Sequence, residues 1–327
     1  MILAAGFGTR LFPLTIDRTK PAIPFLGKPL VGYVAEYIAK YGFNDVVVNL
    51  HHQPESVKAA LGDGSDFGVK IHYTYEEPKI LGTAGALDNA RHLLEGDTFL
   101  IANGKIITDI DIHEALETHK RTGALATMVL KENAGFEKFT EVLVEDNRIK
   151  GFGDGFPSRN QENPDQKPPL MFTGIHILEP RVFDYIPRGV YSDIVPTFYN
   201  PALRNGEKIV AHITKAKWFE LSTIPRYLDI TLKMLNGSAD RNVVGKNSLI
   251  SQTAKIEDSI LWDNVTIEDG AMIERSIIGD DVCIKSGEIY RNVAIVRGDM
   301  LEHCSEIPQK AMKGTLVDDN YVVPLDQ

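Results

Sequence analysis

The sequence is short of several features that define common classes of protein. It has only two cysteines, Cys283 and Cys304, and their spacing fits no zinc motif. It has no run of basic residues, and a net charge of −10 argues against nucleic acid or an anionic membrane as a partner. No uninterrupted apolar stretch is long enough to span a bilayer, and the N-terminus lacks the basic region of a signal peptide. These absences favour a protein of the reducing cytoplasm.

What the sequence does contain is typical of a folded globular protein. Of its 327 residues, 43% are apolar and 24% are charged, which excludes a disordered or fibrous chain. The length fits one large domain or two medium ones.

Residues 1–235 alternate short apolar strands with helical patterns. Strands are expected at residues 1–4, 45–50, 70–75, 98–101, 126–130, 141–144, 174–178 and 209–213. Helices are expected at residues 31–38, 54–61, 84–94 and 225–235. This alternation predicts an α/β fold with a mostly parallel, Rossmann-like sheet covered on both faces. Residues 153–169 are rich in Pro, Gly, Asn and Asp, and we interpret them as a mobile loop.

The pattern changes after residues 236–238. Apolar residues then recur in steps of 5 or 6, at Ile250, Ile256, Leu261, Ile267, Ile273, Ile278, Ile284, Ile289 and Ile295. No helix has this period, whereas a hexapeptide parallel β-helix does, with these side chains pointing into a narrow core. A small antiparallel sandwich with accidental spacing is the alternative. A stack of coils exposes apolar ends, so we expect a cover from the first domain, a partner subunit or residues 300–327.

The strand–helix alternation and the repeated step of 5 or 6 residues predict four segments of the chain. Residues 1–235 form the first domain and residues 236–248 a linker. Residues 249–298 form the β-helix, and residues 299–327 form a C-terminal tail.

A glycine-rich loop follows the first strand. Residues 3–11 read LAAGFGTRL, with PLT at 13–15 and Lys20-Pro21 beyond. A loop in this place lies at the carboxyl edge of the sheet, where ligands bind in such folds. Glycines let backbone N–H groups approach an anion, and Arg10 and Lys20 add positive charge. The third glycine of a dinucleotide fingerprint is missing, so we interpret the loop as a phosphate site of another kind.

The whole string resembles the signature L-A-A-G-x-G-T-R-L-x-P-L-T…K-P of the sugar-1-phosphate nucleotidyltransferases, also called NDP-sugar pyrophosphorylases. Within that family, the chain is most similar to bacterial mannose-1-phosphate guanylyltransferase-like proteins. The resemblance covers nearly the whole chain and continues at residues 81–87 (LGTAGAL), 103–104, 173–175 and 218–228. A left-handed β-helix at the C-terminus is common in this family, so both halves of the chain agree.

The resemblance implies that an NTP and a sugar-1-phosphate are converted to an NDP-sugar and pyrophosphate. It assigns the nucleotide to Leu3, Ala4, Ala5, Gly6, Gly8, Thr9, Gly82, Thr83, Asn103 and Gly104. It assigns catalytic charge to Arg10, Lys20 and Lys105. It places Gly174 in the sugar pocket, and Trp218 either walls that pocket or packs in the core. Guanine with mannose is the first expectation for the substrates, and uracil or thymine with a hexose is the second. A homo-oligomer formed through the β-helix is expected.

The sequence departs from the family where the family holds Mg²⁺, the cofactor that the resemblance implies. The family's two metal-binding aspartates correspond here to Lys105 and Glu220. The family also has a lysine that meets the sugar phosphate, and the equivalent residues 154–156 contain none.

Three interpretations of this altered site remain open. In the first, Lys105 replaces the charge of the metal and pairs with Glu220, although one ammonium cannot bridge oxygens as Mg²⁺ does. In the second, the metal is held by Glu220 with Asp109 or Asp111; the alternative for that aspartate pair is a cap on the helix that starts near Ile112. In the third, the chain binds a nucleotide or an NDP-sugar without turnover and regulates a partner subunit.

Overall fold

The computed structural model describes residues 1–158, 167–238, 241–304 and 306–326. Contacts within the chain divide it into two units, each described by itself below. The sheet unit comprises Met1–Ala5, Val34–His51 and Gly62–Trp218. The β-helix unit comprises Gly6–Tyr33, His52–Leu61 and Phe219–Gln327.

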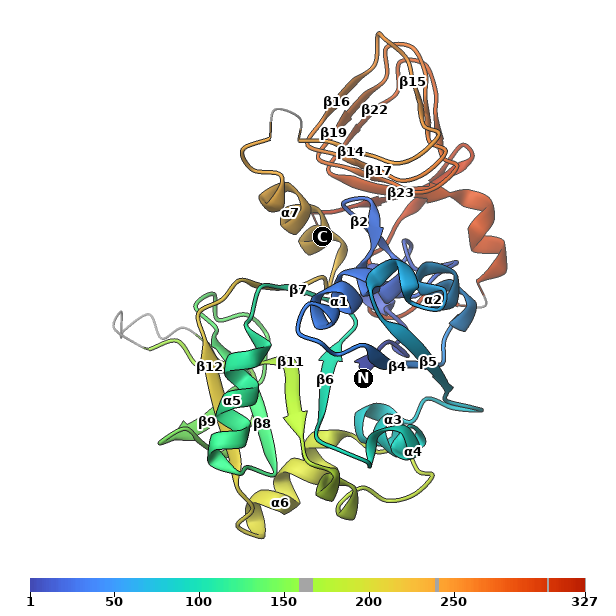
Figure 1. The fold of residues 1–327 in the computed structure, drawn as a ribbon. Coiled ribbons are helices and arrows are strands. Elements are labelled where there is room, and N and C mark those ends of the chain that lie inside the picture. The colour runs from blue at the N-terminus through green and yellow to red at the C-terminus, as the bar shows by residue number, and fades with distance from the viewer. Residues whose placement is uncertain (159–166, 239–240, 305, 327) are drawn as a thin grey trace. The chain divides into compact units, whose positions relative to one another are not determined.

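The sheet unit is built on one sheet of nine strands (Figure 1). In spatial order these are β5 (Lys70–Tyr75), β4 (Asp45–Leu50), β1 (Ile2–Leu3), β6 (Phe99–Asn103), β11 (Leu170–Leu178), β8 (Ala126–Glu132), β12 (Ile209–Thr214), β10 (Arg148–Phe152) and β9 (Val142–Glu145). The first four are parallel to one another, and β12 is parallel to β8. Strand β11 runs antiparallel between β6 and β8, and β10 and β9 form an antiparallel edge. The α/β sheet is therefore mixed, with its parallel pairs in two groups.

Helices lie along this sheet because its central strands are apolar on both faces. In β4, the run Val46–Leu50 is buried throughout, as expected of a parallel strand with covered faces. The helices are α1 (Leu30–Ala39), α3 (Gly82–Asn89), α4 (Arg91–Leu94), α5 (Ile112–Thr122) and α6 (Asn200–Arg204). Helix α5 is capped at its start by Asp111, whose carboxylate accepts the N–H of His113 at 2.8 Å. Short 3-10 or π turns are η1 (Thr9–Leu11), η2 (Lys20–Ala22), η3 (Ser65–Phe67), η4 (Pro180–Asp184), η5 (Val195–Tyr199) and η6 (Gly298–His303).

Most of the predicted elements of residues 1–235 are present. Strands β4 and β5 and the helix α2 (Pro54–Leu61) have the predicted bounds. The single helix expected at 84–94 is wrong, because the chain leaves the α-helical conformation at Ala90 and forms α3 and α4. The predicted loop 153–169 lies partly outside the described residues. Further strands are β7 (Ile106–Thr108), β13 (Trp218–Glu220) and a hairpin of β2 (Pro24–Phe25) with β3 (Lys28–Pro29).

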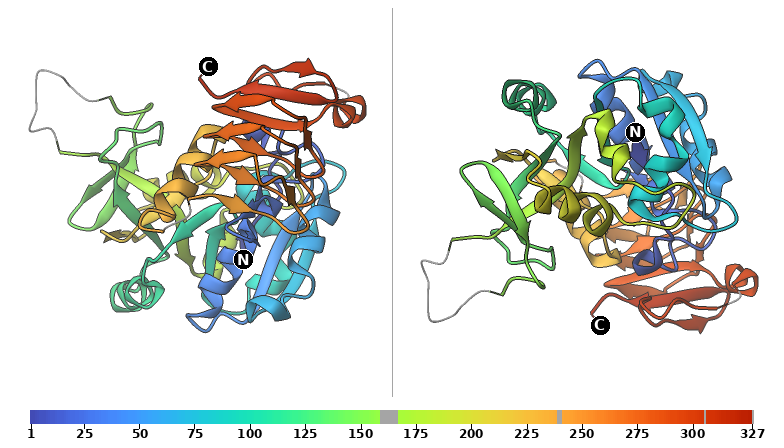
Figure 2. Two further views of the ribbon diagram at one scale, coloured as in Figure 1. Left: turned by 90° about the horizontal axis from the view of Figure 1, so that it is seen from above. Right: turned by 90° about the horizontal axis from the view of Figure 1, so that it is seen from below.

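The C-terminal part of the β-helix unit is a parallel β-helix with three faces, seen along its axis in Figure 1 and from the side in Figure 2. One face stacks β14 (Val243–Val244), β17 (Ile260–Leu261), β20 (Ile277–Ile278) and β23 (Val293–Arg297). The second stacks β15 (Leu249–Ile250), β18 (Thr266–Ile267) and β21 (Cys283–Ile284), and the third stacks β16 (Lys255–Glu257), β19 (Met272–Glu274) and β22 (Ile289–Arg291). Stacked residues are 17 apart, as in the contact from Asp263 to Asp280, so one coil takes two steps of 6 residues and one of 5. Helix α7 (Ile224–Met234) precedes the first coil.

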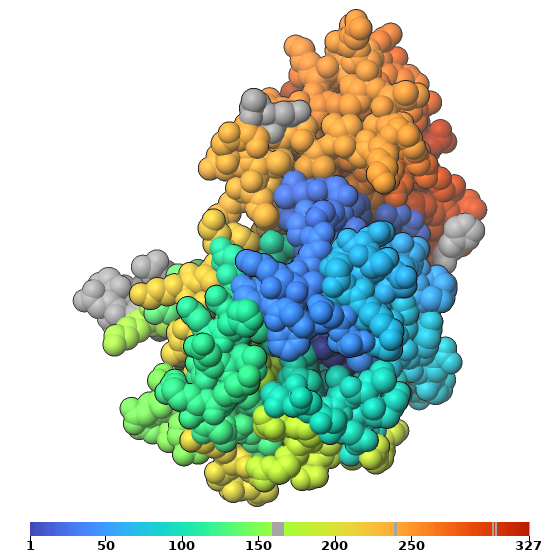
Figure 3. All heavy atoms as spheres, in the orientation of Figure 1, coloured from blue at the N-terminus to red at the C-terminus, as the bar shows by residue number. Residues whose placement is uncertain are grey.

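The core of the β-helix is formed by most of the residues that the spacing predicted. Buried in it are Leu261, Ile267, Ile273, Ile278, Ile284 and Ile295. Figure 3 shows the outer surface of the coils, drawn in orange and red. The prediction is wrong for Ile250 and Ile289, whose exposed fractions are 39% and 54%. Ile250 belongs to the outermost strand of its face. On the third face, Tyr290 pairs with Ile273 and packs against the core in place of Ile289.

The C-terminal residues cover the last coil. Strand β25 (Asn320–Pro324) pairs antiparallel with β23 and with β24 (Thr315–Val317), and Val322 joins the β-helix core. Residues of the predicted tail therefore supply one of the three covers expected. At the other end, β14 falls within the residues predicted as a linker. Among the described residues, no helix combines the length and apolar character needed to cross a membrane.

Candidate functional site

The predicted site residues are distributed over both units. In the sheet unit, the strands β1, β4 and β6 run parallel, so their carboxyl ends meet at one edge. Leu3 pairs with Asn49 on one side and with Asn103 on the other. The predicted nucleotide residues Ala4 and Ala5 follow directly and are buried. The fold thus brings the end of the first strand and the turn after β6 together.

A buried hydrogen-bond network ties this edge to the segment that carries Gly82. The N–H of Ala4 donates to Oδ1 of Asn49 at 2.9 Å. Nδ2 of Asn49 donates to Oε1 of Glu76 at 2.6 Å, and the N–H of Leu81 donates to Oε2 of Glu76 at 2.6 Å. Glu76 is only 1% exposed. Its carboxylate therefore fixes the residue before Gly82 relative to the end of β1.

Gly104 and Gly174 permit close approaches at the same edge. The N–H of Gly104 donates to the carbonyl of Leu3 at 2.9 Å, and a Cβ at Gly104 would lie 2.9 Å from that oxygen. Gly174 has φ +81°, and a Cβ there would lie 2.1 Å from Nδ2 of Asn103. The amide of Asn103 therefore lies directly over Gly174, so a predicted nucleotide residue contacts a predicted sugar-pocket residue.

The LGTAG segment is held by a second stretch of chain. Gly82 has φ +74°, and a Cβ there would lie 2.7 Å from the carbonyl oxygen of Ser192. Oγ1 of Thr83 accepts the N–H of Ile194 at 2.8 Å. The carboxylate of Asp193 lies 3.4 Å from both the N–H and the hydroxyl of Thr83. Only glycine fits at position 82, because its backbone conformation is left-handed and the backbone of residue 192 is close.

The indole of Trp218 is buried in the sheet unit. It is 7% exposed, and its Nε1 donates to the carbonyl of Thr173 at 2.9 Å. The ring of Phe139 meets it edge to face at 5.5 Å. This indole fixes the backbone just before Gly174.

In the β-helix unit, the glycine loop folds back on the segment that carries Lys20. Gly8 has φ +67°, and a Cβ there would lie 3.2 Å from both Cβ of Lys20 and Cγ2 of Thr15. The hydroxyl of Thr15 donates to the carbonyl of Gly8 at 3.4 Å. Lys20 is only 8% exposed, whereas Gly6 and Arg10 are exposed. The loop therefore presents backbone and one guanidinium to solvent, backed by a buried lysine.

One of the residues at the predicted metal site is unsuited to a magnesium ion. Mg²⁺ requires oxygen ligands, and Lys105 supplies an ammonium instead. The carboxylate of Asp109 accepts the N–H of Lys217 at 2.6 Å, so one of its oxygens is already engaged. Asp111 caps helix α5, as described above. A helix cap was the alternative that the sequence predicted for this residue, in place of a metal ligand. In the described part of the chain, no group of three His, Cys, Asp or Glu residues could hold a metal ion.

Sequence reasoning missed Asn49 and Glu76. Two signals were present, namely a polar residue near the end of an otherwise buried apolar strand and an acidic residue directly after the next strand.

Glu220, the other predicted metal residue, is 7% exposed, and its carbonyl accepts a hydrogen bond from Nε of Arg226 at 3.2 Å.

Comparisons with known proteins identify the family of this chain. The family model described as "nucleotidyl transferase" matches residues 1–237, and the model "GlmU-like, C-terminal hexapeptide" matches residues 232–305. The chain is 32% identical over 243 residues to UTP–glucose-1-phosphate uridylyltransferase of Synechocystis, a match that covers 69% of this chain and 61% of that protein.

Two further relatives differ in their named substrates. The N-acetylmuramate alpha-1-phosphate uridylyltransferase of Neisseria meningitidis is 32% identical over 69% of this chain and 94% of its own length. The mannose-1-phosphate guanylyltransferase of Mycobacterium tuberculosis is 27% identical over 73% of this chain and 65% of its own. The match therefore spans less than two thirds of the Synechocystis and Mycobacterium relatives.

A solved structure shows the same fold. The putative glucose-1-phosphate thymidylyltransferase of Bacillus anthracis superposes with a TM-score of 0.58 at 23% identity, over 68% of this chain and 89% of that one.

Proposed function

This chain belongs to the nucleotidyl transferase family, and we propose that it makes an NDP-sugar and pyrophosphate from an NTP and a sugar-1-phosphate. The observation that carries the proposal is the glycine loop. Its left-handed Gly8, the buried Lys20 behind it and the exposed Arg10 form an arrangement suited to the phosphates of an NTP. A protein that only bound the NDP-sugar product would need no such site for departing pyrophosphate.

The proposed reaction is an in-line displacement at phosphorus. An oxygen of the sugar phosphate attacks the α-phosphorus and forms a new P–O bond, while the bond to the β-phosphate bridging oxygen breaks. Pyrophosphate leaves with that electron pair. The protein supplies position and positive charge, since little covalent chemistry is required of it.

Roles in this reaction follow from the residues and from the family resemblance. The N–H groups of residues 6–10, with Arg10 and Lys20, would hold the β- and γ-phosphates. Gly82 and Thr83 would contact the nucleoside, and Gly174 would allow the sugar to approach Asn103. Because Lys105 stands where the family has a metal-binding aspartate, we assign to it the positive charge that the family's Mg²⁺ supplies elsewhere.

A second candidate function is supported by the same substitutions. Lys105 and the lysine-free residues 154–156 would suit a homologue that binds nucleotide or NDP-sugar and regulates a partner subunit. Loss of a metal ligand removes charge stabilisation from phosphoryl transfer without unfolding the domain.

Substrates and assembly are part of the proposal as well. We propose guanine with mannose first and uracil or thymine with a hexose second. Relatives named for guanylyl transfer to mannose and for uridylyl transfer to glucose agree with both pairs and do not rank them. A reaction of this kind places the protein in the cytoplasm, where NTPs are made. A homo-oligomer through the β-helix is supported by Leu249, which is 68% exposed on the outermost strand β15. Light scattering after gel filtration measures the mass of the assembly and so tests this proposal.

Substitution of Lys105 separates the two candidate functions. If Lys105 carries catalytic charge, Lys105→Met lowers pyrophosphate release about a hundredfold or more, because one catalytic electrostatic contact commonly contributes that much. Lys120→Met, the same change at an exposed residue of α5, is the matched control and leaves the rate unchanged. The regulatory candidate predicts no activity in the native chain and a gain of Mg²⁺-dependent activity in Lys105→Asp.

A further inference from the structure

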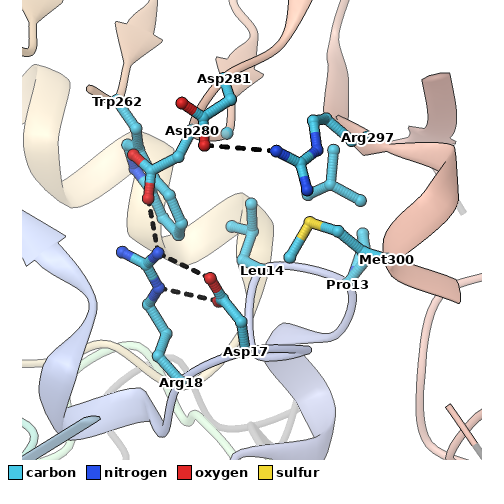
Figure 4. Close-up of a pocket in the computed structure, with 11 residues that line it drawn as sticks. Pro13, Leu14, Asp17, Arg18, Trp262, Asp280, Asp281, Arg297 and Met300 are labelled. Atoms are coloured by element: carbon cyan, nitrogen blue, oxygen red, sulfur yellow. Dashed lines mark hydrogen bonds and ion pairs between the residues drawn. The ribbon is translucent and has the colours of Figure 1, made fainter. Parts of the chain in front are cut away.

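Arg18 lies two residues before Lys20 and is held by two carboxylates (Figure 4). Its Nε and Nη2 donate to the two carboxylate oxygens of Asp17 at 2.9 and 2.8 Å. Nη2 also donates to Oδ2 of Asp280 at 2.5 Å. Asp280 belongs to a coil of the β-helix, 262 residues further along the chain. The guanidinium therefore connects the segment after the glycine loop with the β-helix.

The β-helix presents a rigid acceptor to this arginine. The other oxygen of Asp280, Oδ1, accepts the N–H of Asp263 in the preceding coil at 2.8 Å. The indole of Trp262 lies under the guanidinium, whose Cζ is 4.9 Å from the ring centre. Nε1 of Trp262 donates to the hydroxyl of Tyr227 at 3.1 Å, which fixes the ring. Lysine cannot replace arginine at this position, because only a planar guanidinium can bind two carboxylates and stack on an aromatic face at once.

The charges of Arg18 and Asp17 persist at neutral pH. Burial alone would lower the pKa of Arg18, but the carboxylates of Asp17 and Asp280 outweigh it and raise that pKa. Burial works against the charge of Asp17 too, yet hydrogen bonds from Arg18 lower the pKa of its carboxyl overall. A cavity of only about 40 Å³ remains, lined by Pro13, Leu14, Asp17, Arg18, Trp262, Gly279, Asp280, Asp281, Val296, Arg297 and Met300. Arg18 and Asp280 are partly buried, with side chains 21% and 23% exposed, whereas Asp17 is 44% exposed.

The segment that carries Arg18 also positions the loop. Thr15 and Lys20 lie against Gly8, as described above. On its other side, the segment is anchored to α2 and to the residue before it. The N–H of Thr19 donates to Oγ of Ser56 in α2 at 3.1 Å, and Nε2 of Gln53 donates to the carbonyl of Ile16. Residues 13–20 are therefore held from α2 and from the β-helix at once.

We propose that Arg18 is a positioning residue and that the β-helix, through Asp280, fixes the conformation of the glycine loop for the triphosphate. The proposal rests on the proposed function, because the loop in question is the one assigned to the NTP phosphates. It gives the β-helix a part in the reaction beyond assembly. Arg18 touches no substrate in this account and acts only through residues 13–20.

The experiment compares amide hydrogen exchange of residues 13–20 in the full-length chain. Asp280→Asn replaces one of the two accepting oxygens with an NH₂ group. That group faces either the guanidinium of Arg18 or the N–H of Asp263, so in both orientations two donors face each other. Exchange in the segment is expected to rise about tenfold. Arg18→Lys, which keeps the charge but loses the planar contacts, is expected to raise it as well.

Asp281→Asn is the matched control. It removes the same charge from the neighbouring position, but the carboxylate of Asp281 contacts Asn264 at 3.0 Å and Arg297 at 3.4 Å instead of Arg18. Exchange in residues 13–20 is expected to match that of the native chain.

One kinetic and one binding measurement distinguish positioning from general stability. In Asp280→Asn, the KM for NTP is expected to rise about tenfold while the KM for the sugar-1-phosphate stays unchanged. Binding of inorganic pyrophosphate, measured by calorimetry, is expected to weaken by a similar factor.

The outcomes are separable from those of the proposed function. Unchanged exchange in Asp280→Asn, or a rise spread evenly over the whole chain, overturns the inference even when turnover is present. If the native chain turns over no substrate, the proposed function fails, and pyrophosphate binding together with exchange still decides whether Asp280 positions the loop.

Discussion

Replacing Glu76 with glutamine would place one hydrogen-bond donor against another inside the sheet unit. The direction of each bond in the network is fixed. Because Ala4 donates its N–H to Oδ1 of Asn49, the amide nitrogen of Asn49 must face Glu76 as a donor. The N–H of Leu81 is the second donor. Only a carboxylate accepts from both, so a glutamine leaves one contact between two N–H groups.

The magnitude follows from the burial of this group. A buried polar group left without its partner costs about 1–3 kcal/mol, and hydrogen bonds to a charged acceptor lie at the upper end. Glu76 is 1% exposed, so water cannot replace the lost contact. We expect Glu76→Gln to lower the free energy of unfolding by about 2–3 kcal/mol, which corresponds to roughly 5–10 °C in Tm for a domain of this size.

Urea denaturation of the full-length chain measures the change, and the neighbouring exposed residue supplies the control. Glu77→Gln alters the same charge one position along and is expected to stay within about 0.5 kcal/mol of the native chain. The KM for NTP is expected to rise in Glu76→Gln alone, because Leu81 precedes the predicted nucleoside residues. If the two variants unfold at the same urea concentration, the directional argument for this network is refuted.

Three further substitutions or conditions test other parts of the account. Gly174→Ala puts a methyl group 2.1 Å from Nδ2 of Asn103 at φ +81°, so it is expected to raise the KM for the sugar-1-phosphate tenfold or more; an unchanged KM contradicts the assignment. Gly8→Ala, at φ +67°, is expected to cost about 1–2 kcal/mol of stability and to weaken NTP binding, and native affinity for NTP would contradict it. Burial lowers the pKa of His176 to about 3 while the unfolded chain protonates below about 6.5, so stability is lost as pH falls from 6.5 toward 3. About 1 kcal/mol is expected to disappear between pH 7 and 5.5 in urea titrations, and His176→Gln is expected to remove that part of the pH dependence.

Much of the fold could be predicted because the relevant signals are local. The alternation of apolar strands and helical spacings located β4, β5 and α2, and the repeated step of 5 or 6 located the β-helix. The errors have physical causes. At residues 289 and 290 two apolar side chains are adjacent, and only the pairing with Ile273 decides that Tyr290 faces the core. The exposure of Ile250 depends on its place in an outermost strand, which its own sequence does not encode.

In the candidate site too, some parts could be predicted from local sequence and others could not. The glycine loop, with its backbone function, could be found from consecutive residues. The partners of Glu76 could not, because Asn49 lies 27 residues away and only the parallel pairing of strands brings it near. The contact of Arg18 with Asp280 spans 262 residues, so no pattern in the sequence indicates it.

The most direct test of the central claim is pyrophosphate release by the full-length chain. ATP, CTP, GTP, UTP and dTTP are each paired with mannose-, glucose- and N-acetylhexosamine-1-phosphate, with Mg²⁺ or with EDTA. The account predicts release with at least one pair, and release that survives EDTA, because Lys105 supplies the charge. Release that needs Mg²⁺ contradicts the role of Lys105. No release with any pair, while NDP-sugars still raise the Tm, contradicts the transferase itself and identifies a binding protein.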